Sequence, residues 1–258
     1  MPRIDLNSDM GESFGAYHLG QDEDLMKSIS SANIACGWHA GDPMVMNRTV
    51  QMAATHGVGI GAHPGFPDLL GFGRRYMECT AEEIRNYIIC QVGALKGFCS
   101  ANGVKMQHVK PHGALYNASV DNETIAIAIA EGIARVDPKL LQVVLAGPKG
   151  AALAEIGKRV GIRVVFEAFA DRAYTPQGTL VHRREPGAVI KDTREVATRV
   201  LKMAREGKVT AVDGTEIDLV AQTICVHGDT PGAVEMVRSI RRLLESEGVE
   251  IKPMGVEI

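Results

Sequence analysis

Short apolar runs alternate along this chain with longer segments in which apolar residues recur at helical spacing. The short runs are rich in β-branched residues and end at turn residues, and their nearly continuous apolar character is typical of strands that are covered on both faces. Seven strands are predicted, at Ile4–Asp9, Ala32–Cys36, Gly59–His63, Gln107–Pro111, Gln142–Ala146, Arg163–Ala168 and Thr223–His227.

Helical segments fill the gaps between the strands. Thr80 with Glu83 three residues later is the capping-box pattern, and it opens a helix that runs through Ser100. Asp192 with Glu195 repeats this pattern ahead of another helix. Strand and helix thus alternate seven times, which predicts βαβ units with a parallel sheet, either open and doubly wound or closed into a barrel. Further helices are predicted at Pro43–His56, Asn122–Val136 and Lys149–Val160, and from Thr230-Pro231 to Gly248.

The longest gap, between the sixth and seventh strands, contains two strand-like runs around Asp213-Gly214. A turn of this kind between strand-like runs predicts a β-hairpin, which we interpret as an insertion near residues 208–219. No Pro/Ser-rich linker, charge block or long repeat divides the chain. We therefore expect residues 1–258 to form one domain, since a chain of 258 residues is near the usual size of a single α/β barrel.

Overall charge and composition exclude several classes of partner. The chain has 28 Lys and Arg against 31 Asp and Glu, so it lacks the concentrated basic surface that nucleic acid or an anionic membrane requires. The N-terminus has no apolar signal region and no apolar run is long enough to span a bilayer, so we expect a soluble, cytoplasmic protein. The five cysteines are odd in number and never spaced Cys-x-x-Cys, which argues against a disulfide framework or a structural zinc knuckle.

Ionisable side chains follow six of the seven predicted strands. In parallel α/β folds the loops at the carboxyl ends of the strands converge on a ligand. Half of the eight histidines, namely His39, His63, His112 and His227, lie within three residues of a predicted strand end, beside carboxylates and glycines. The sequence therefore predicts a functional site at this edge of the sheet.

Single residues in these loops also have structural explanations. Asp42 before Pro43 has the pattern of a helix N-cap, and the Arg74-Arg75 pair has that of a solvated loop. Lys110 is harder to explain in this way. Burying an unpaired ammonium in a strand costs several kcal/mol, so this lysine requires an anionic partner or a chemical task.

The residue types narrow the chemistry of the predicted site. Carboxylates with imidazoles suit general acid–base catalysis or a divalent metal, and lysine with arginine suits an anionic substrate or developing negative charge. No Gly-x-Ser-x-Gly elbow and no Gly-x-x-x-x-Gly-Lys-Ser/Thr loop occurs, and Gly57-x-Gly59-x-Gly61 lies within a predicted strand instead of after one. Chemistry with ATP would therefore need a non-standard site or another subunit.

The blocks at the strand ends, taken in order, resemble the LamB/YcsF family over essentially the whole chain. The blocks that carry this resemblance are Asp5–Glu12, Ala32–Pro43, Gly61–Pro64, Gly71–Arg75, Val109–Asn117, Glu167–Arg172 and Cys225–Asp229. The resemblance implies an irregular seven-stranded β/α barrel of the glycoside hydrolase/deacetylase type, in agreement with the seven predicted strands. It also implies ATP-dependent hydrolysis of 5-oxo-L-proline to L-glutamate, with release of ADP and phosphate, carried out with two partner subunits, B and C.

This reaction assigns roles to the residues at the strand ends. ATP would activate the amide oxygen of the lactam as a phosphate ester, water activated by a base would attack, and the leaving nitrogen would take a proton. The candidate catalytic residues are an acid–base group and two residues that stabilise developing negative charge, namely Asp9, Glu12, His39 and His63, with Lys110 and His112. Arg74 and Arg172 are assigned to the substrate carboxylate, within a candidate substrate-binding set of Asn33, Asp42, Arg74, Arg75, Glu167, Asp171, Arg172, His227 and Asp229.

Two other functions fit the same residues. One is a metal-dependent amidohydrolase or sugar deacetylase that acts alone, and the other is a substrate-binding scaffold whose partner carries out the chemistry. Related barrel deacetylases hold a metal with an Asp and a His-x-x-x-His pair, but here the second loop reads His39-x-x-Asp42, so that site does not carry over. Asp9, His39 and His63 remain candidate ligands for a divalent ion.

Overall fold

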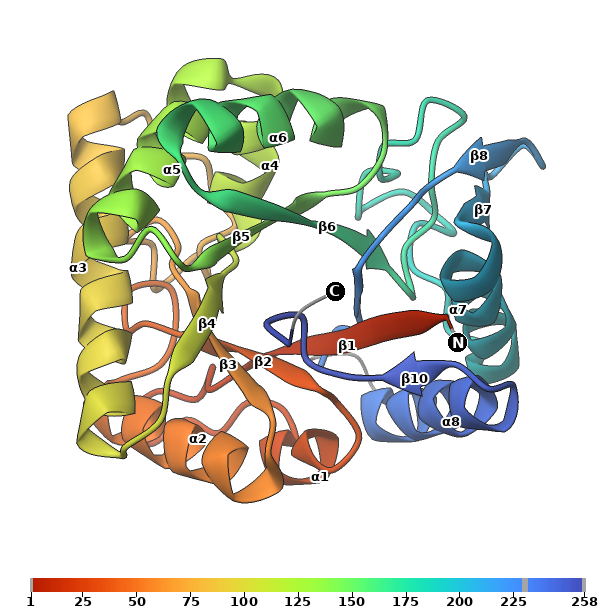
Figure 1. Ribbon diagram of the computed structural model, residues 1–258, viewed down its shortest axis with the longest axis horizontal. Coiled ribbons are helices and arrows are strands. Elements are labelled where there is room, and N and C mark those ends of the chain that lie inside the picture. The colour runs from red at the N-terminus through yellow and green to blue at the C-terminus, as the bar shows by residue number, and fades with distance from the viewer. Residues whose placement is uncertain (1, 229–231, 257–258) are drawn as a thin grey trace.

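Parallel strands close into a barrel at the centre of the molecule, with the helices arranged around them (Figure 1). The computed structural model describes residues 2–228 and 232–256. β9 pairs with β6 on one side and with β1 on the other, so within these residues the sheet is a closed barrel and not an open one. Its seven strands are β1 (Arg3–Met10), β2 (Ser31–Ala35), β3 (Gly59–His63), β4 (Met106–Val109), β5 (Leu141–Leu145), β6 (Arg163–Phe169) and β9 (Thr223–Cys225), which confirms the seven predicted from the sequence.

Three short strands lie outside the closed ring. β7 (Lys208–Thr210) and β8 (Glu216–Asp218) pair antiparallel, at the place where the Asp213-Gly214 turn predicts a hairpin. β10 (Glu250–Ile251) pairs parallel with the start of β1. The hydrophobic pattern does not predict β10, because two residues are too few to show a strand period.

Eight helices of the described ranges cover the barrel. Thr80 forms the predicted capping box with Glu83, and the side chains of Asp192 and Asn122 also cap helices. Within the described ranges no helix is both long and apolar enough to cross a membrane. The helices are α1 (Asp22–Met26), α2 (Pro43–His56), α3 (Ala81–Ala101), α4 (Gly113–Asp121), α5 (Glu123–Val136), α6 (Pro148–Val160), α7 (Thr193–Glu206) and α8 (Ala233–Ser246).

Several element boundaries differ from the sequence-based prediction. β1 begins at Arg3 and ends at Met10, one residue beyond each end of the predicted strand Ile4–Asp9. The short helices α1 and α4 were not predicted, since α1 spans little more than one turn and only three residues separate α4 from the end of β4. The predicted helix start at Thr230-Pro231 lies outside the described residues, and α8 begins at Ala233.

Alternation along β1 separates an apolar outer face from a polar barrel interior. Ile4 and Leu6 are fully buried in the main hydrophobic core, on the side that the helices cover. Asp5 and Asn7 point into the barrel, where Asn7 donates to Glu167 at 3.0 Å. Side chains alternate in this way along every strand of a barrel, so a polar period of two marks the lumen.

Glycines of β3 make room for the polar side chains in this interior. A Cβ atom at Gly61 would lie 2.0 Å from Nε2 of His108, and one at Gly59 would meet the amide of Gln107. The side chains of His108 and Gln107 thus occupy the space that a β3 side chain would fill. His108 in turn places Nε2 2.7 Å from Oδ1 of Asn33, which joins β4 to the network of β1 and β2.

The carboxyl group of Asp5 makes stability depend on pH. It accepts hydrogen bonds from Ser30, Ser31 and Thr223, yet burial raises its pKa to about 6 from an ordinary 3.8. Because the folded protein then binds this proton more tightly than the unfolded chain, the contribution of Asp5 to stability falls as the pH rises from about 4 to about 6. We therefore expect the free energy of unfolding of Asp5→Asn, relative to that of wild type, to rise by about 3 kcal/mol between about pH 4 and pH 6. Urea unfolding at a series of pH values measures this difference. A difference that does not vary with pH would contradict this expectation.

Candidate active site at the carboxyl ends of the strands

Asp9, at the carboxyl end of β1, is held by side chains from β2 and β3 and by one from the residue after β4. Oδ1 accepts from Nδ2 of Asn33 at 2.9 Å and from Nζ of Lys110 at 3.0 Å, while Oδ2 lies 3.4 Å from Nε2 of His63. Burial alone would raise the pKa of Asp9, but the positive charges of His63 and Lys110 outweigh it and hold the pKa well below its ordinary value. Asp9 is therefore ionised at neutral pH.

Lys110 directly follows β4, one residue beyond the strand's end, and is a buried ammonium surrounded by anionic and polar groups, as expected from its buried surroundings. Nζ lies 3.0 Å from Oε1 of Glu167 and 3.1 Å from Sγ of Cys225, in addition to its contact with Asp9. Burial alone would lower its pKa, but Asp9, Cys225 and Glu167 together raise the pKa of Lys110 well above its ordinary value. The lysine is thus permanently charged and fixes the positions of two carboxylates.

His63 and His112 form a pair that carries one positive charge. Nδ1 of His63 lies 2.7 Å from the carbonyl oxygen of Lys110, and Nε2 of His112 lies 2.8 Å from that of Phe72. Carbonyl oxygens only accept, so both of these outer nitrogens carry hydrogen. The inner nitrogens, Nε2 of His63 and Nδ1 of His112, are 2.9 Å apart and share a third hydrogen, one more than two neutral rings hold. Burial and the charge of His63 lower the pKa of His112 to about 3.

His39 packs face to face on His112, with ring centroids 3.8 Å apart. It is fully buried, and neither ring nitrogen has a hydrogen-bond partner among the described residues. Its Nε2 lies 3.6 Å from Oε1 of Glu12, and burial with the charges of His112 and His63 lowers its pKa well below the ordinary value. His39 is therefore a neutral imidazole with unused lone-pair capacity beside a carboxylate.

Glycines let the loops approach these rings closely. A Cβ at Gly65 would lie 2.8 Å from Nδ1 of His39, and one at Gly73 would lie 2.7 Å from the ring of His112. Gly73 also has a φ of +63°, in the left-handed region that favours glycine. The loop after β3 therefore packs on the histidines in a way that only glycine allows at these positions.

A second imidazole–carboxylate pair lies across the barrel. Nδ1 of His227 lies 2.8 Å from Oδ1 of Asp171, and the ring of His227 stacks on that of Phe169. Burial would raise the pKa of Asp171, but the charge of His227 and its hydrogen bond lower it below the ordinary value. Asp171 thus orients His227 toward the space above Lys110, since both His227 and Lys110 line the same cavity.

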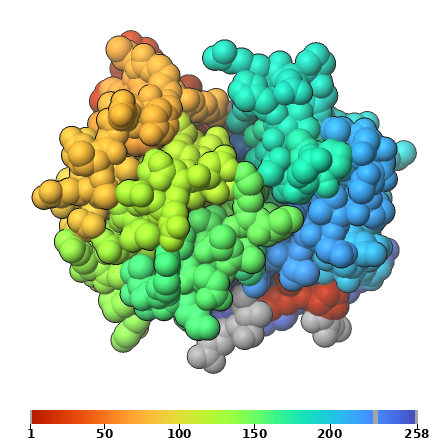
Figure 2. All heavy atoms as spheres, turned by 90° about the horizontal axis from the view of Figure 1, so that it is seen from above, coloured from red at the N-terminus to blue at the C-terminus, as the bar shows by residue number. Residues whose placement is uncertain are grey.

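A cavity of about 860 Å³ opens above this group of residues. In Figure 2 the molecule is hollowed between the segment around residues 172–190, coloured teal, and the yellow-green segment around residues 110–121. Asp9, His63, Lys110 and His112 line its inner part. Its lining also includes basic side chains, namely Arg74, Lys149, Arg172, Arg183 and Arg184.

Some predicted site residues lie away from this cavity. Asp42 caps α2, accepting from the backbone of Met44 and Val45, as its sequence pattern allows. Arg75 is largely exposed and pairs with Asp68, whose carboxylate also accepts from backbone N–H groups of the same loop. Both side chains thus shape loops that lead to the site. Asp229 lies outside the described residues.

The remaining predicted residues lie in or beneath the cavity. Arg74 lines it and lies over the ring of Phe72 at 5.0 Å. Asn33 and Glu167 are buried below it and hold Asp9 and Lys110 in place. Sequence reasoning missed Asn7, which donates to Glu167 and accepts from Asn33 at 2.7 Å. The polar alternation of β1 was the signal that could have found it.

Arg172 reaches the cavity but is occupied by backbone. It donates to the carbonyl oxygens of Val181 and Ala188, at 2.7 and 3.3 Å, and so folds the segment between them against the barrel. We expect Arg172→Ala to cost about 2–3 kcal/mol and to expose that segment to limited proteolysis. KM for the substrate should rise more than kcat falls, because the segment forms the cavity wall. The exposed Arg163→Ala serves as control. Unchanged proteolysis of Arg172→Ala would contradict this role.

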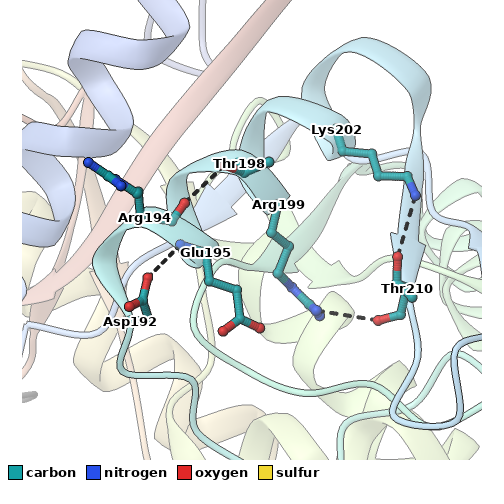
Figure 3. Close-up of a pocket in the computed structure, with 7 residues that line it drawn as sticks. All are labelled: Asp192, Arg194, Glu195, Thr198, Arg199, Lys202 and Thr210. Atoms are coloured by element: carbon teal, nitrogen blue, oxygen red, sulfur yellow. Dashed lines mark hydrogen bonds between the residues drawn. The ribbon is translucent and has the colours of Figure 1, made fainter.

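Another cavity, of about 520 Å³, lies on the outer face of α7 (Figure 3). It shares no lining residue with the cavity above the barrel. Its charged side chains are engaged locally: the side chain of Asp192 caps the helix at Glu195, and Arg199 and Lys202 donate to Thr210. This pocket is therefore a surface feature. The cavity above the barrel is the one lined by Asp9, His63, Lys110 and His112.

Comparison with known proteins extends over almost the whole chain. The model of the LamB/YcsF family matches residues 4–257. A protein of Pyrococcus furiosus, named as the A subunit of 5-oxoprolinase, is 57% identical over 98% of each chain. A lactam utilization protein from Thermus thermophilus has a solved structure with a TM-score of 0.92 and 46% identity, covering 98% of this chain and 100% of that one. A GH113 β-1,4-mannanase, at 10% identity and a TM-score of 0.57, covering 95% of this chain and 100% of that one, shares the barrel fold alone.

Proposed function

Because this chain belongs to the LamB/YcsF family, we propose that it is the A subunit of a 5-oxoprolinase and that its barrel cavity is where the lactam ring of 5-oxo-L-proline is opened. The observation that carries this proposal is the charge arrangement on the cavity floor. An ionised carboxylate, Asp9, lies between the ammonium of Lys110 and the positively charged His63–His112 pair. A carboxylate that accepts a proton beside fixed positive charges is what hydrolysis of an amide requires.

In the proposed reaction, Asp9 orients the attacking water and accepts its proton. The positive charges of Lys110 and of the His63–His112 pair stabilise the negative charge of the phosphoryl group that the amide oxygen carries. They are fixed before the substrate arrives, since Lys110 is 3% exposed and both histidines are hydrogen-bonded to backbone carbonyls. The nitrogen that leaves the carbonyl carbon takes a proton, which Asp9 returns after accepting it from the attacking water.

The proposed use of ATP follows from the stability of a five-membered lactam. Transfer of the γ-phosphoryl group to the amide oxygen releases ADP and makes the ring carbon electrophilic. Addition of water and cleavage of the C–N bond then leave an acyl phosphate and a free amine, and a second water releases phosphate and glutamate. The basic side chains of the cavity lining, Arg74, Lys149, Arg183 and Arg184, suit the phosphoryl group and the substrate carboxylate.

Partner subunits are part of the proposal. The chain has no Gly-rich phosphate loop of the P-loop type, so we assign delivery of the phosphoryl group to a complex with two further subunits, B and C. The name of the Pyrococcus furiosus relative, which describes that protein as one subunit, supports an assembly of this kind.

One assay tests the proposal against its alternatives. The purified protein is incubated with 5-oxo-L-proline, alone and with candidate B and C subunits, with and without ATP, while glutamate and ADP are measured. We expect glutamate and ADP in equal amounts with all three subunits and ATP present. Glutamate formed without ATP would instead indicate an amidohydrolase acting alone. Full turnover with the cavity residues of this chain substituted would indicate a scaffold.

A further inference from the structure

The facing nitrogens of His63 and His112 have the arrangement of paired metal ligands. Each outer nitrogen donates to a backbone carbonyl, at 2.7 Å for His63 and 2.8 Å for His112. Such outer hydrogen bonds fix the tautomer and the ring orientation of metal-binding histidines. They leave Nε2 of His63 and Nδ1 of His112 facing each other 2.9 Å apart, so both nitrogens can address one point between the rings.

Glu12 and His39 lie close to the same point. Oε1 of Glu12 lies 3.8 Å from Nδ1 of His112 and 3.6 Å from Nε2 of His39. Donor atoms of Glu12, His39, His63 and His112 all lie within 4.8 Å of one another. Ligands about 2.0–2.2 Å from one ion are separated by distances of this order. A second observation concerns His39, which lies beside this group. It is completely buried, and neither of its ring nitrogens has a hydrogen-bond partner among the described residues, as expected beside a group that binds a ligand.

We propose that Glu12, His63 and His112 bind one divalent transition-metal ion, with Zn²⁺ favoured by this set of two imidazoles and one carboxylate. His39 is placed beside the ion instead of among its ligands. Its ring is parallel to that of His112 within 4° at a centroid distance of 3.8 Å, so one ion cannot lie in both ring planes. The ring of His63 is perpendicular to that of His112, which allows both to address one point.

A bound ion would place a positive charge between His63 and His112, beside two carboxylates. Asp9, with Oδ2 3.4 Å from Nε2 of His63, and Glu12 would supply negative charge around it. The donor set differs from the Asp and His-x-x-x-His arrangement, because it takes Glu12 from the loop after β1 and histidines from β3 and from the start of α4. This inference concerns ion binding by the chain itself, so it stands or falls independently of the reaction proposed above.

Metal content and cobalt absorption test the proposal on the full-length protein. The purified chain is stripped with a chelator, equilibrated with micromolar Zn²⁺ or Co²⁺, freed of excess ion, and analysed for metal and for visible Co²⁺ absorption. We expect one ion per chain, visible absorption bands of a low-coordinate Co²⁺, and a thermal unfolding transition raised by Zn²⁺. Glu12→Gln and His112→Gln should each weaken binding by about 100-fold or more, since each removes a ligand.

Matched variants separate a specific site from general effects. His56→Gln changes an exposed histidine on α2 and should leave binding unchanged. His39→Gln should retain one ion per chain, because this ring is not a ligand. Circular dichroism of each variant establishes that it is folded. Failure of the wild-type protein to retain Zn²⁺ or Co²⁺ would overturn the proposal. Ion binding that survives both Glu12→Gln and His112→Gln would also overturn it. Loss of ion binding in His39→Gln would contradict the placement of His39 beside the ion.

Discussion

Replacing Asp9 by Asn lowers the rate of glutamate formation by the assembled enzyme about 10²–10⁴-fold, because the amide cannot accept the proton of the attacking water. The substitution keeps the size of the side chain and its hydrogen bond from Nδ2 of Asn33. It removes the charge that faces Lys110 and His63 at the floor of the cavity. Initial rates at saturating 5-oxoproline and ATP, compared with wild type, measure this effect on kcat.

A control and a contrary result define this prediction. Asp24→Asn changes a half-exposed carboxylate on α1 that pairs with Lys27 at 3.1 Å, and should leave kcat unchanged. Assembly with the partner subunits is followed by size-exclusion chromatography, so that loss of activity is not loss of the complex. Wild-type kcat in a folded, assembled Asp9→Asn protein would remove Asp9 from the chemistry.

Replacing Lys110 by Met destabilises the protein by about 3–5 kcal/mol, because it removes the cation from two buried carboxylates. Nζ of Lys110 lies 3.0 Å from Asp9 and 3.0 Å from Glu167, and Glu167 is completely buried. Without Lys110, one of the positive charges that lower the pKa of Asp9 is lost, so this pKa rises from its depressed value. Chemical denaturation at pH 7 measures the loss of stability.

Two further variants test whether the effect comes from the unpaired charges. Lys110→Met combined with Glu167→Gln should recover part of the stability, because a neutral amide then replaces one of the two carboxylates that lack a counter-charge. The double variant should not recover activity. Lys96→Met removes a half-exposed lysine that pairs with Asp137 at 3.0 Å, and should cost less than about 1 kcal/mol. If the double variant is no more stable than Lys110→Met, the loss of stability does not come from buried carboxylates left without a counter-charge.

The sequence was sufficient to predict the barrel strands and the edge at which the site lies. Continuous apolar runs marked the strands, and the histidines and carboxylates after them are brought together because parallel strands end at one edge. Lys110 was correctly expected to have anionic partners, since an ammonium in a buried strand needs them. The choice between an open sheet and a barrel was not decided by periodicity, because it depends on whether β9 pairs with β1.

What the sequence could not show was the direction of individual side chains. Asp42 and Arg75 follow strands as the cavity residues do, but Asp42 turns back to cap a helix and Arg75 turns outward to Asp68. Arg172 reaches the cavity, yet its guanidinium is held by the carbonyls of Val181 and Ala188, which no pattern in the sequence indicates. The proton shared by His63 and His112 depends on carbonyls of two loops, and only the folded geometry reveals it.

The position of bound substrate tests the central claim most directly. The structure of the chain assembled with its partner subunits is determined in the presence of 5-oxo-L-proline and a non-hydrolysable ATP analogue. The account predicts the lactam in the cavity above the barrel, with its amide carbonyl within hydrogen-bond reach of Lys110 or the His63–His112 pair and its reactive carbon facing Asp9. A lactam bound in the pocket on α7, or wholly within another subunit, would contradict it.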